Sequence, residues 1–209
     1  MSVGGVGSVG VGGVDLKGMD LETAMMMVQT RRTELLESQL KDQIDQVSKR
    51  NDQIAKLNSA LSELNRALNL FDGDAKSTDV LHKQKAWKGE VDNSYPIERA
   101  VNSALIEAGL TNLDLTKNTG GGGGVTNTRN PDGSEVRMPN GVRGDCSKGQ
   151  LDAAIQKIKG LIDAESNSQQ MDMLRLQSLS NKRNEAFDLM TNFIKKMHDG
   201  RASIVGNMR

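Results

Sequence analysis

Residues 36–71 read LESQLKDQIDQVSKRNDQIAKLNSALSELNRALNLF, and this stretch decides the fold. It contains neither proline nor glycine, and an apolar residue returns every seven positions at Leu40, Val47, Ile54, Leu61 and Leu68. A seven-residue repeat places its apolar residues in a stripe along one side of a long α-helix. With these residues at the d position of a heptad, other apolar residues fall at g or a: Leu36, Leu57, Leu64, Phe71 and Ile44.

The stripe requires a long helix with a partner. We predict one helix from about Asp20, its N-cap, to Phe71. Such a helix of about 50 residues is about 75 Å long at 1.5 Å per residue. Because an isolated rod of that length cannot bury its own stripe, the sequence predicts that another helix covers it.

Three asparagines, Asn51, Asn58 and Asn65, occupy the a positions and admit two interpretations. Buried asparagines at a fix the register and the number of helices in a coiled coil. Alternatively, the d and g positions form the seam, and the asparagines lie at its wet edge. Three buried asparagine layers in succession would be costly, which favours the second interpretation.

A second helical pattern runs from about Gln150 to Asp199. Its apolar residues follow three- and four-residue steps: Leu151, Ile155, Ile158, Ile162, Leu176, Leu179, Met190, Phe193 and Met197. The stretch Asp163–Gln170 is polar on all sides, which predicts a kink or a change of partner. Gly200 is expected to end the helix, with Lys195 and Lys196 near the negative end of its dipole.

Between these patterns, residues 72–149 lack a long repeat. Pro96 opens and Gly109 ends a predicted short helix, whose apolar face is Ile97, Val101, Ala104, Leu105 and Ala108. The five glycines 120–124 form a predicted link. Turn signals flank the alternating stretch Glu135–Met138, where a small hairpin is predicted.

The simplest fold is mainly α, with two long terminal helices that form an antiparallel coiled-coil hairpin. A small irregular, α+β central insert joins them. We expect five segments: a flexible Gly/Val-rich stretch (1–18), an N-terminal coiled-coil helix (19–71), the insert (72–149), a C-terminal coiled-coil helix (150–200) and a tail (201–209).

Composition argues against several classes of function. With 27 basic and 27 acidic residues, the chain offers no broad field to capture nucleic acid or an anionic membrane. The single cysteine excludes an intrachain disulfide and a cysteine-based zinc cluster. No apolar run approaches the roughly 20 residues that span a bilayer, and no cleavable export signal is recognisable. We therefore expect a cytoplasmic protein, or one exported by another route.

Candidate chemical sites are weak. Gly5–Gly10 matches G-x-G-x-x-G but lacks the preceding strand that dinucleotide binding requires. His82 and His198 have no further ligands at metal-binding spacing, so we expect both on the surface. Lys148 near Cys146 would lower the pKa of the thiol, but no general base accompanies it. We predict no enzyme activity, no metal and no cofactor.

Two clusters suggest contacts. Lys83, Lys85, Trp87 and Lys88 resemble a small basic patch, but we expect Trp87 to anchor the middle segment on the helical stem. Methionine side chains adapt to varied surfaces, and four lie near the start of the first helix: Met19, Met25, Met26 and Met27. They contact a partner or a neighbouring copy, or they are buried at the end of the stem.

The layout resembles the type III secretion translocator filament and needle-tip proteins, the EspA-like group. Ser94-Tyr95-Pro96-Ile97-Glu98-Arg99-Ala100-Val101 is similar to a segment in the same place in that family. The endings Met190-Thr191-Asn192-Phe193-Ile194 and Ser203-Ile204-Val205-Gly206 are similar too. The tract Gly120–Gly124, in the central insert, departs from the family.

The resemblance implies a secreted protein at the bacterial surface, exported through the injectisome without a cleaved signal and with residues 1–18 as its export segment. Its copies would polymerise helically, extend the needle and connect it to the translocator pore proteins, after delivery by a dedicated chaperone. The central insert would face outward. A closed-ring needle-tip cap is one alternative, and a cytoplasmic coiled-coil adaptor or chaperone is another.

Overall fold

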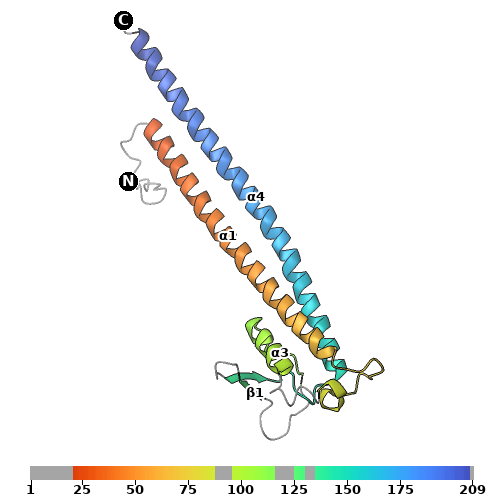
Figure 1. Ribbon diagram of the computed structural model, residues 1–209. Coiled ribbons are helices and arrows are strands. Elements are labelled where there is room, and N and C mark those ends of the chain that lie inside the picture. Colours follow the sequence, from red (N-terminus) through yellow and green to blue (C-terminus); the bar gives the residue numbers. More distant parts are fainter. Residues whose placement is uncertain (1–20, 88–95, 116–124, 130–134, 208–209) are drawn as a thin grey trace, which may run out of the picture. The chain divides into compact units, whose positions relative to one another are not determined.

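Two long helices dominate the protein (Figure 1). The computed structural model describes residues 21–87, 96–115, 125–129 and 135–207. Helix α1 is Leu21–Leu68, and helix α4 is Lys148–Asn207. Between them lie the short 3-10 turn η1, Leu81–Lys83, the helix α3, Pro96–Glu107, and the strands β1, Val125–Arg129, and β2, Glu135–Pro139. The protein is therefore mainly helical.

The chain divides into two compact units, each of which takes a part of both long helices. Unit 1 combines Met1–Val47 with Met171–Arg209, and unit 2 is Ser48–Gln170. The boundary in α4 falls at the end of the polar stretch Asp163–Gln170, where the sequence predicts a kink or a change of partner. The helix itself continues through this stretch without interruption.

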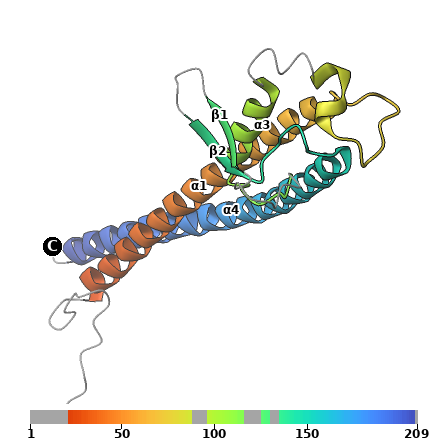
Figure 2. The ribbon, with the colours of Figure 1, turned by 90° about the horizontal axis from the view of Figure 1, so that it is seen from below.

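The hydrophobic core lies in unit 2. It joins α1, α3 and α4 through fully buried side chains, among them Leu64, Leu105 and Ile158. Helix α3 lies beside the last part of α1 in each view (Figures 1 and 2), and Gln53 Nε2 on α1 donates to Ala108 O at 3.0 Å. Three helices and the segments that connect them therefore form the core.

Helix α3 matches its sequence pattern closely. It begins at Pro96, and Gly109 just beyond its end has a φ of +73°, a conformation that glycine adopts at no steric cost. Its predicted apolar face is the face that the core covers, with Ile97 half-buried and the others buried: Val101, Ala104, Leu105 and Ala108.

Two connecting segments close the core of unit 2. Residues 77–82 run along residues 144–149, with Leu81 N donating to Cys146 O at 3.0 Å and Gly149 N donating to Ser77 O at 2.9 Å. The buried ring of Trp87 lies against Gly144, where a Cβ would come within 3.3 Å of Trp87 Nε1. A side chain at position 144 would therefore crowd Trp87 and His82 and require them to shift slightly.

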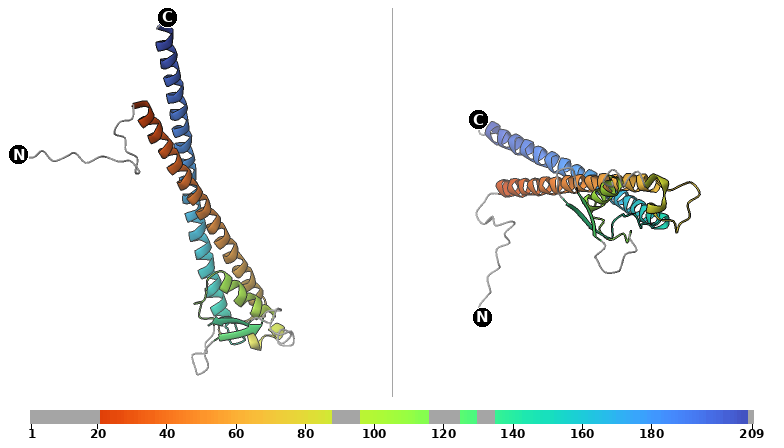
Figure 3. Two further views of the ribbon diagram at one scale, coloured as in Figure 1. Left: turned by 90° about the vertical axis from the view of Figure 1, so that its left-hand side faces the viewer. Right: turned by 60° about the horizontal axis from the view of Figure 1, so that its bottom comes forward.

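The two strands pair beside α3 in unit 2 (Figures 2 and 3). They are antiparallel, and their register joins Val125 to Pro139 and Arg129 to Glu135. Asn140 follows β2 with a φ of +54°, and its carbonyl accepts a hydrogen bond of 3.0 Å from Leu115 N. The chain turns here toward the core.

The end of α4 differs from the prediction. Gly200 does not end the helix, which continues to Asn207 through most of the predicted tail. Glycine within a helix costs only about 1 kcal/mol relative to alanine, which flanking helical residues can offset. The proposed N-cap Asp20, the segment 1–18 and the glycines 120–124 lie outside the described residues.

Unit 1 contains the first part of α1 and the last part of α4. Within it, Arg201 Nη2 on α4 lies 3.3 Å from Glu22 Oε2 on α1. Both side chains are well exposed, so this ion pair adds little stability. In the helices that the structure describes, no segment combines the length and the apolar character that crossing a membrane requires.

Candidate assembly surface

Large apolar side chains are exposed mainly in unit 1. Their exposed fractions lie between 36% and 67%, and they occur on both helices: Met25, Met26, Val28, Leu35, Ile44, Met171, Met173, Leu174, Phe187, Leu189 and Ile194. Over the described part of unit 2, only Ile106 and Leu161 are comparably exposed. Scattered exposed apolar residues are ordinary, but a concentration on one part of a protein marks an interaction surface.

The side chains buried in unit 1 are largely polar. Thr33, Gln43 and Asp172 are buried, whereas Leu36 and Ala186 are the buried hydrophobic residues among the described part of this unit. Three buried side-chain atoms lack a hydrogen-bond partner within the described ranges: Gln29 Oε1, Gln43 Nε2 and Arg183 Nε. Each such atom costs about 1–3 kcal/mol. Unit 1 therefore buries several polar atoms, while many of its large apolar side chains face solvent.

The predicted stripe of α1 is buried on one flank rather than at its centre. Its g positions are buried: Leu36, Leu57, Leu64 and Phe71. Its d positions are only half-buried: Leu40, Val47, Ile54, Leu61 and Leu68. Ile44 at an a position is exposed. Ala60 and Ala67, which are completely buried at c positions, were not predicted; alanine repeated at seven residues in an otherwise polar row was the available signal.

The asparagines at the a positions lie on the surface, as the favoured interpretation predicts. Asn58 Nδ2 donates to Ile54 O at 3.0 Å, and Asn65 Nδ2 donates to Leu61 O at 2.9 Å. Asn51 accepts a hydrogen bond from Gln169 of α4. These side chains therefore border the covered face and do not form buried layers.

The predicted residues of α4 separate between the two units. In unit 2, Leu151, Ile155 and Ile158 are buried in the core, and Ile162 packs against it half-buried. In unit 1 the predicted residues are half-buried: Leu176, Leu179, Met190, Phe193 and Met197. The last group shares its helix face with the buried Asp172 and Ala186.

Two further apolar rows on unit 1 lie outside the predicted coiled-coil residues, although the predicted methionine cluster includes Met25. The α1 stripe comprises Met25, Val28 and Leu35, spaced by three and seven residues. The α4 stripe comprises Met173, Phe187 and Ile194, spaced by fourteen and seven residues. Because seven residues make nearly two helical turns, each stripe stays on one face of its helix. Both stripes are exposed.

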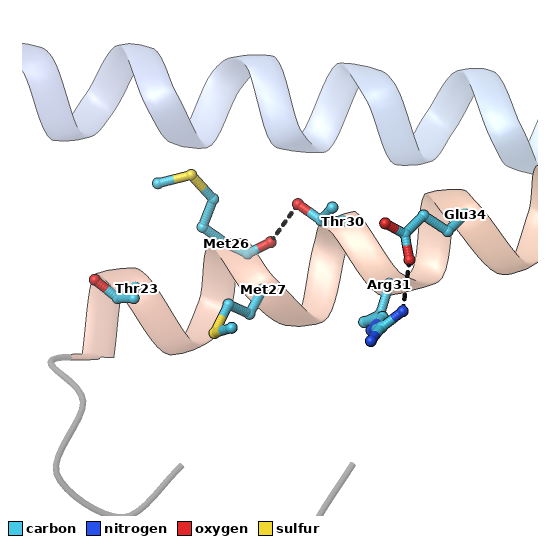
Figure 4. A pocket seen from close by; sticks show the side chains of 6 residues that line it. All are labelled: Thr23, Met26, Met27, Thr30, Arg31 and Glu34. Atoms are coloured by element: carbon cyan, nitrogen blue, oxygen red, sulfur yellow. Dashed lines mark hydrogen bonds and ion pairs between the residues drawn. The ribbon is translucent and has the colours of Figure 1, made fainter. Parts of the chain in front are cut away.

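A hollow of about 370 Å³ opens beside the first turns of α1, lined by Thr23, Met26, Met27, Thr30, Arg31 and Glu34. Met26 points toward the neighbouring ribbon of α4, whereas Met27 and Arg31 point the other way (Figure 4). Arg31 Nη1 pairs with Glu34 Oε2 at 2.9 Å. This lining suits an apolar side chain, because thioethers are soft and adaptable.

The methionine cluster is not buried at the end of the stem. Met25 and Met26 are exposed, and Met27 is half-buried. Met19 lies outside the described residues. These methionines remain available to a partner or a neighbouring copy.

The histidines and the basic patch lack the surroundings of a chemical site. His82 and His198 are both exposed, as predicted. Among the residues with described positions, no group of three or more histidine, cysteine or carboxylate side chains is placed to hold a metal ion. Lys83 and Lys85 are exposed, but Trp87 is only 2% exposed, so its ring cannot stack on a base. Lys88 and the motif Gly5–Gly10 lie outside the described residues.

Cys146 is an inert core residue. Burial, reinforced by the nearby carboxylate of Asp145, raises the pKa of the Cys146 thiol to about 12. Lys148 donates instead to Ala75 O at 3.0 Å, so the prediction that it lowers this pKa is wrong. The thiol is therefore protonated at neutral pH and is not a nucleophile.

Glu98 of α3 is a buried acid that the sequence patterns did not reveal. Burial raises the pKa of Glu98 to about 7; the guanidinium of Arg143 opposes this shift, and Asp145 adds to it. Asp145 Oδ1 is itself buried without a hydrogen-bond partner in the described part of the chain. The Glu98 carboxyl therefore changes charge near neutral pH, inside the folded core.

Comparisons with known proteins identify no relative of the chain. No family model matches it, and no curated protein or solved structure matches it either.

Proposed function

We propose that this chain is a self-polymerising structural subunit whose copies stack through unit 1. One observation carries the proposal: exposed large apolar side chains concentrate in unit 1, while the hydrophobic core lies in unit 2. Removing apolar surface from water is worth about 25 cal/mol per Å², so contact between copies relieves this exposure. A contact between two different surfaces of one molecule repeats from copy to copy, and it produces a filament when the rotation between copies does not close a ring.

The setting that we propose is the type III secretion injectisome. There the chain is the extracellular filament subunit, which extends the needle and links it to the translocon in the host membrane. The resemblance of Ser94–Val101 and Met190–Ile194 to the EspA-like group supports this setting. The partners are further copies, the needle and translocator pore proteins, and a chaperone that covers the apolar stripes before export. This function requires neither a cofactor nor catalytic residues.

The proposed subunit is an antiparallel coiled-coil hairpin with an outward-facing α+β insert. Two ion pairs support the antiparallel direction: Arg50 pairs with Glu165 in unit 2, and Glu22 pairs with Arg201 in unit 1. The residue nearer the start of α1, Glu22, pairs with the residue nearer the end of α4, Arg201. This order is the one expected of antiparallel helices. The strands β1 and β2, in the middle of the chain, form the sheet of the insert.

Negative-stain electron microscopy of the purified chain tests the function. We expect fibres of uniform width that lengthen as the protein concentration rises. A mass that reaches a plateau at a small number of copies would instead indicate a closed needle-tip ring. A monomer at every concentration would contradict self-assembly.

A secretion assay tests the setting separately. Deletion of residues 1–18 should abolish release from bacteria that carry an injectisome, because this segment is the proposed export signal. Unchanged release after the deletion, or retention of the intact chain in the cytoplasm, would favour a cytoplasmic adaptor or chaperone.

A further inference from the structure

We infer that consecutive copies dock the α1 stripe of one subunit, Met25, Val28 and Leu35, onto the α4 stripe of the next, Met173, Phe187 and Ile194. The inference rests on the proposed self-assembly and specifies which surfaces meet. The occupant of each stripe is thus a second copy of this chain.

The two stripes match in spacing. Val28 and Leu35 are separated by seven residues, as are Phe187 and Ile194. At 1.5 Å per residue, each pair is about 10 Å apart along its helix. Side chains repeated at this interval interdigitate when two helices pack in coiled-coil fashion. A helix with the same repeat is therefore the fitting partner for each stripe.

The charges of the two helices favour a contact of α1 with α4 over a contact of like with like. Residues 21–47 carry three basic and five acidic side chains, a net charge of −2. Residues 171–207 carry six basic and four acidic side chains, a net charge of +2. Opposite net charges attract, and two copies of the same segment repel. Exposed charges are screened by salt, so they select the pairing more than they strengthen it.

This pairing also explains a repeating assembly. Both stripes belong to unit 1, so each copy presents two different contact surfaces, the α1 stripe and the α4 stripe. When the α1 stripe of a copy is covered, its α4 stripe remains free for the next copy. Such a heterologous contact continues until the chain of copies ends or closes.

Single-cysteine variants of the full chain test the pairing. Val28→Cys is mixed with Met173→Cys, Phe187→Cys or Ile194→Cys, and a short bismaleimide is added. Each copy carries one introduced thiol, and the buried, protonated Cys146 does not react, so every covalent dimer joins two copies. We expect covalent dimer from at least one of the three mixtures and none from any variant alone.

Ile106→Cys provides the matched control. Ile106 lies on α3 in unit 2 and has the same exposed fraction as Phe187, 37%. Its mixture with Val28→Cys should yield no dimer. Equal yields of covalent dimer from Ile106→Cys and the α4 variants would show that the cross-links arise from random collisions. That result would overturn the inference.

The remaining outcomes separate this pairing from the proposed function. Dimers from one variant alone, or no dimer with any α4 position, would overturn the pairing even if fibres form. Heterologous dimers in a preparation that forms only closed rings would support the pairing and contradict the filament.

Discussion

Asn102 clamps α3 to the segment that leads into α4. Its Nδ2 donates to Val142 O at 3.0 Å, and its Oδ1 accepts from Val142 N at 2.8 Å, all fully buried. Asn102→Ala leaves a buried amide and a buried carbonyl without these bonds. Because each loss costs about 1–3 kcal/mol, we expect the free energy of unfolding to fall by about 2–6 kcal/mol in urea titrations.

The matched control for this clamp is Asn58→Ala. The Asn58 side chain is exposed, and among the described residues it donates to Ile54 O in its own helix. Its removal should change the free energy of unfolding by less than about 0.5 kcal/mol. Equal losses in the two variants would refute the clamp.

Glu98 makes stability depend on pH. Its pKa is about 7 in the folded protein against 4.5 in the unfolded chain, so folding favours the protonated carboxyl. Its contribution is complete below about pH 4.5 and is lost as the pH rises through about 7. The contribution is on the order of 3 kcal/mol, because a tenfold change in a proton-binding constant is worth about 1.4 kcal/mol.

Glu98→Gln isolates this effect, because the amide has a similar shape and does not titrate. We expect the variant to be more stable than the natural chain at pH 8 and to differ much less at pH 4.5, in urea titrations at each pH. A difference between the two proteins that is the same at both pH values would contradict the role of Glu98.

Each long helix has two parts with different surroundings. In α1, Leu64 is fully buried in the core, whereas Leu35 is 59% exposed. Leu64→Ala should lower the free energy of unfolding by about 2–5 kcal/mol, as is usual for a buried leucine. Leu35→Ala should leave it within about 0.5 kcal/mol in the unassembled protein. Similar losses of free energy of unfolding in the two variants, measured by urea titration, would contradict the difference in burial between the two parts of α1.

Hydrogen exchange extends this comparison along both helices. In unassembled protein, the amides of residues 48–68 and 151–170 should exchange more slowly than those of 21–47 and 171–207, because the core stabilises the former. Assembly should then slow exchange in the second group. Uniform protection before and after assembly would count against the proposed contact surface.

The sequence predicts the long helices better than it predicts their covered faces. Heptads without proline or glycine identified α1, and apolar residues at three- and four-residue steps identified most of α4. The rotation of the buried face toward Ala60 and Ala67 was missed, because the alanine repeat is a weak signal and the rotation depends on α3 packing against α1 from a distant part of the chain. Local rules also favoured a stop at Gly200, which the helix passes.

The candidate surface was predicted only in part. The need for a partner follows from the apolar repeat, and the methionines at the start of α1 were identified as candidate contacts. The exposed Val28, Phe187 and Ile194 were not, because periodicity alone does not say which of two apolar faces of a helix is covered within its own chain. Glu98 was missed because its burial arises only in the folded core.

At the scale of the whole molecule, unit 2 contains the folded core, and unit 1 provides the surface through which we propose that copies assemble. Unit 2 buries its apolar side chains, and unit 1 presents them on both of its helices. The insert between α1 and α4 belongs to unit 2. We therefore expect deletion of Gly120–Gly124 to leave fibres intact in electron micrographs. Loss of fibres would show that the insert takes part in assembly.

The most direct test is sedimentation velocity of three proteins over a range of concentrations. The natural chain and Ile106→Asp, altered at an exposed residue of unit 2, should both form large species that grow with concentration. Leu35→Asp should remain small, because its charge would be buried between copies. Large species of Leu35→Asp at the same concentrations, or their loss in Ile106→Asp as well, would contradict assembly through unit 1.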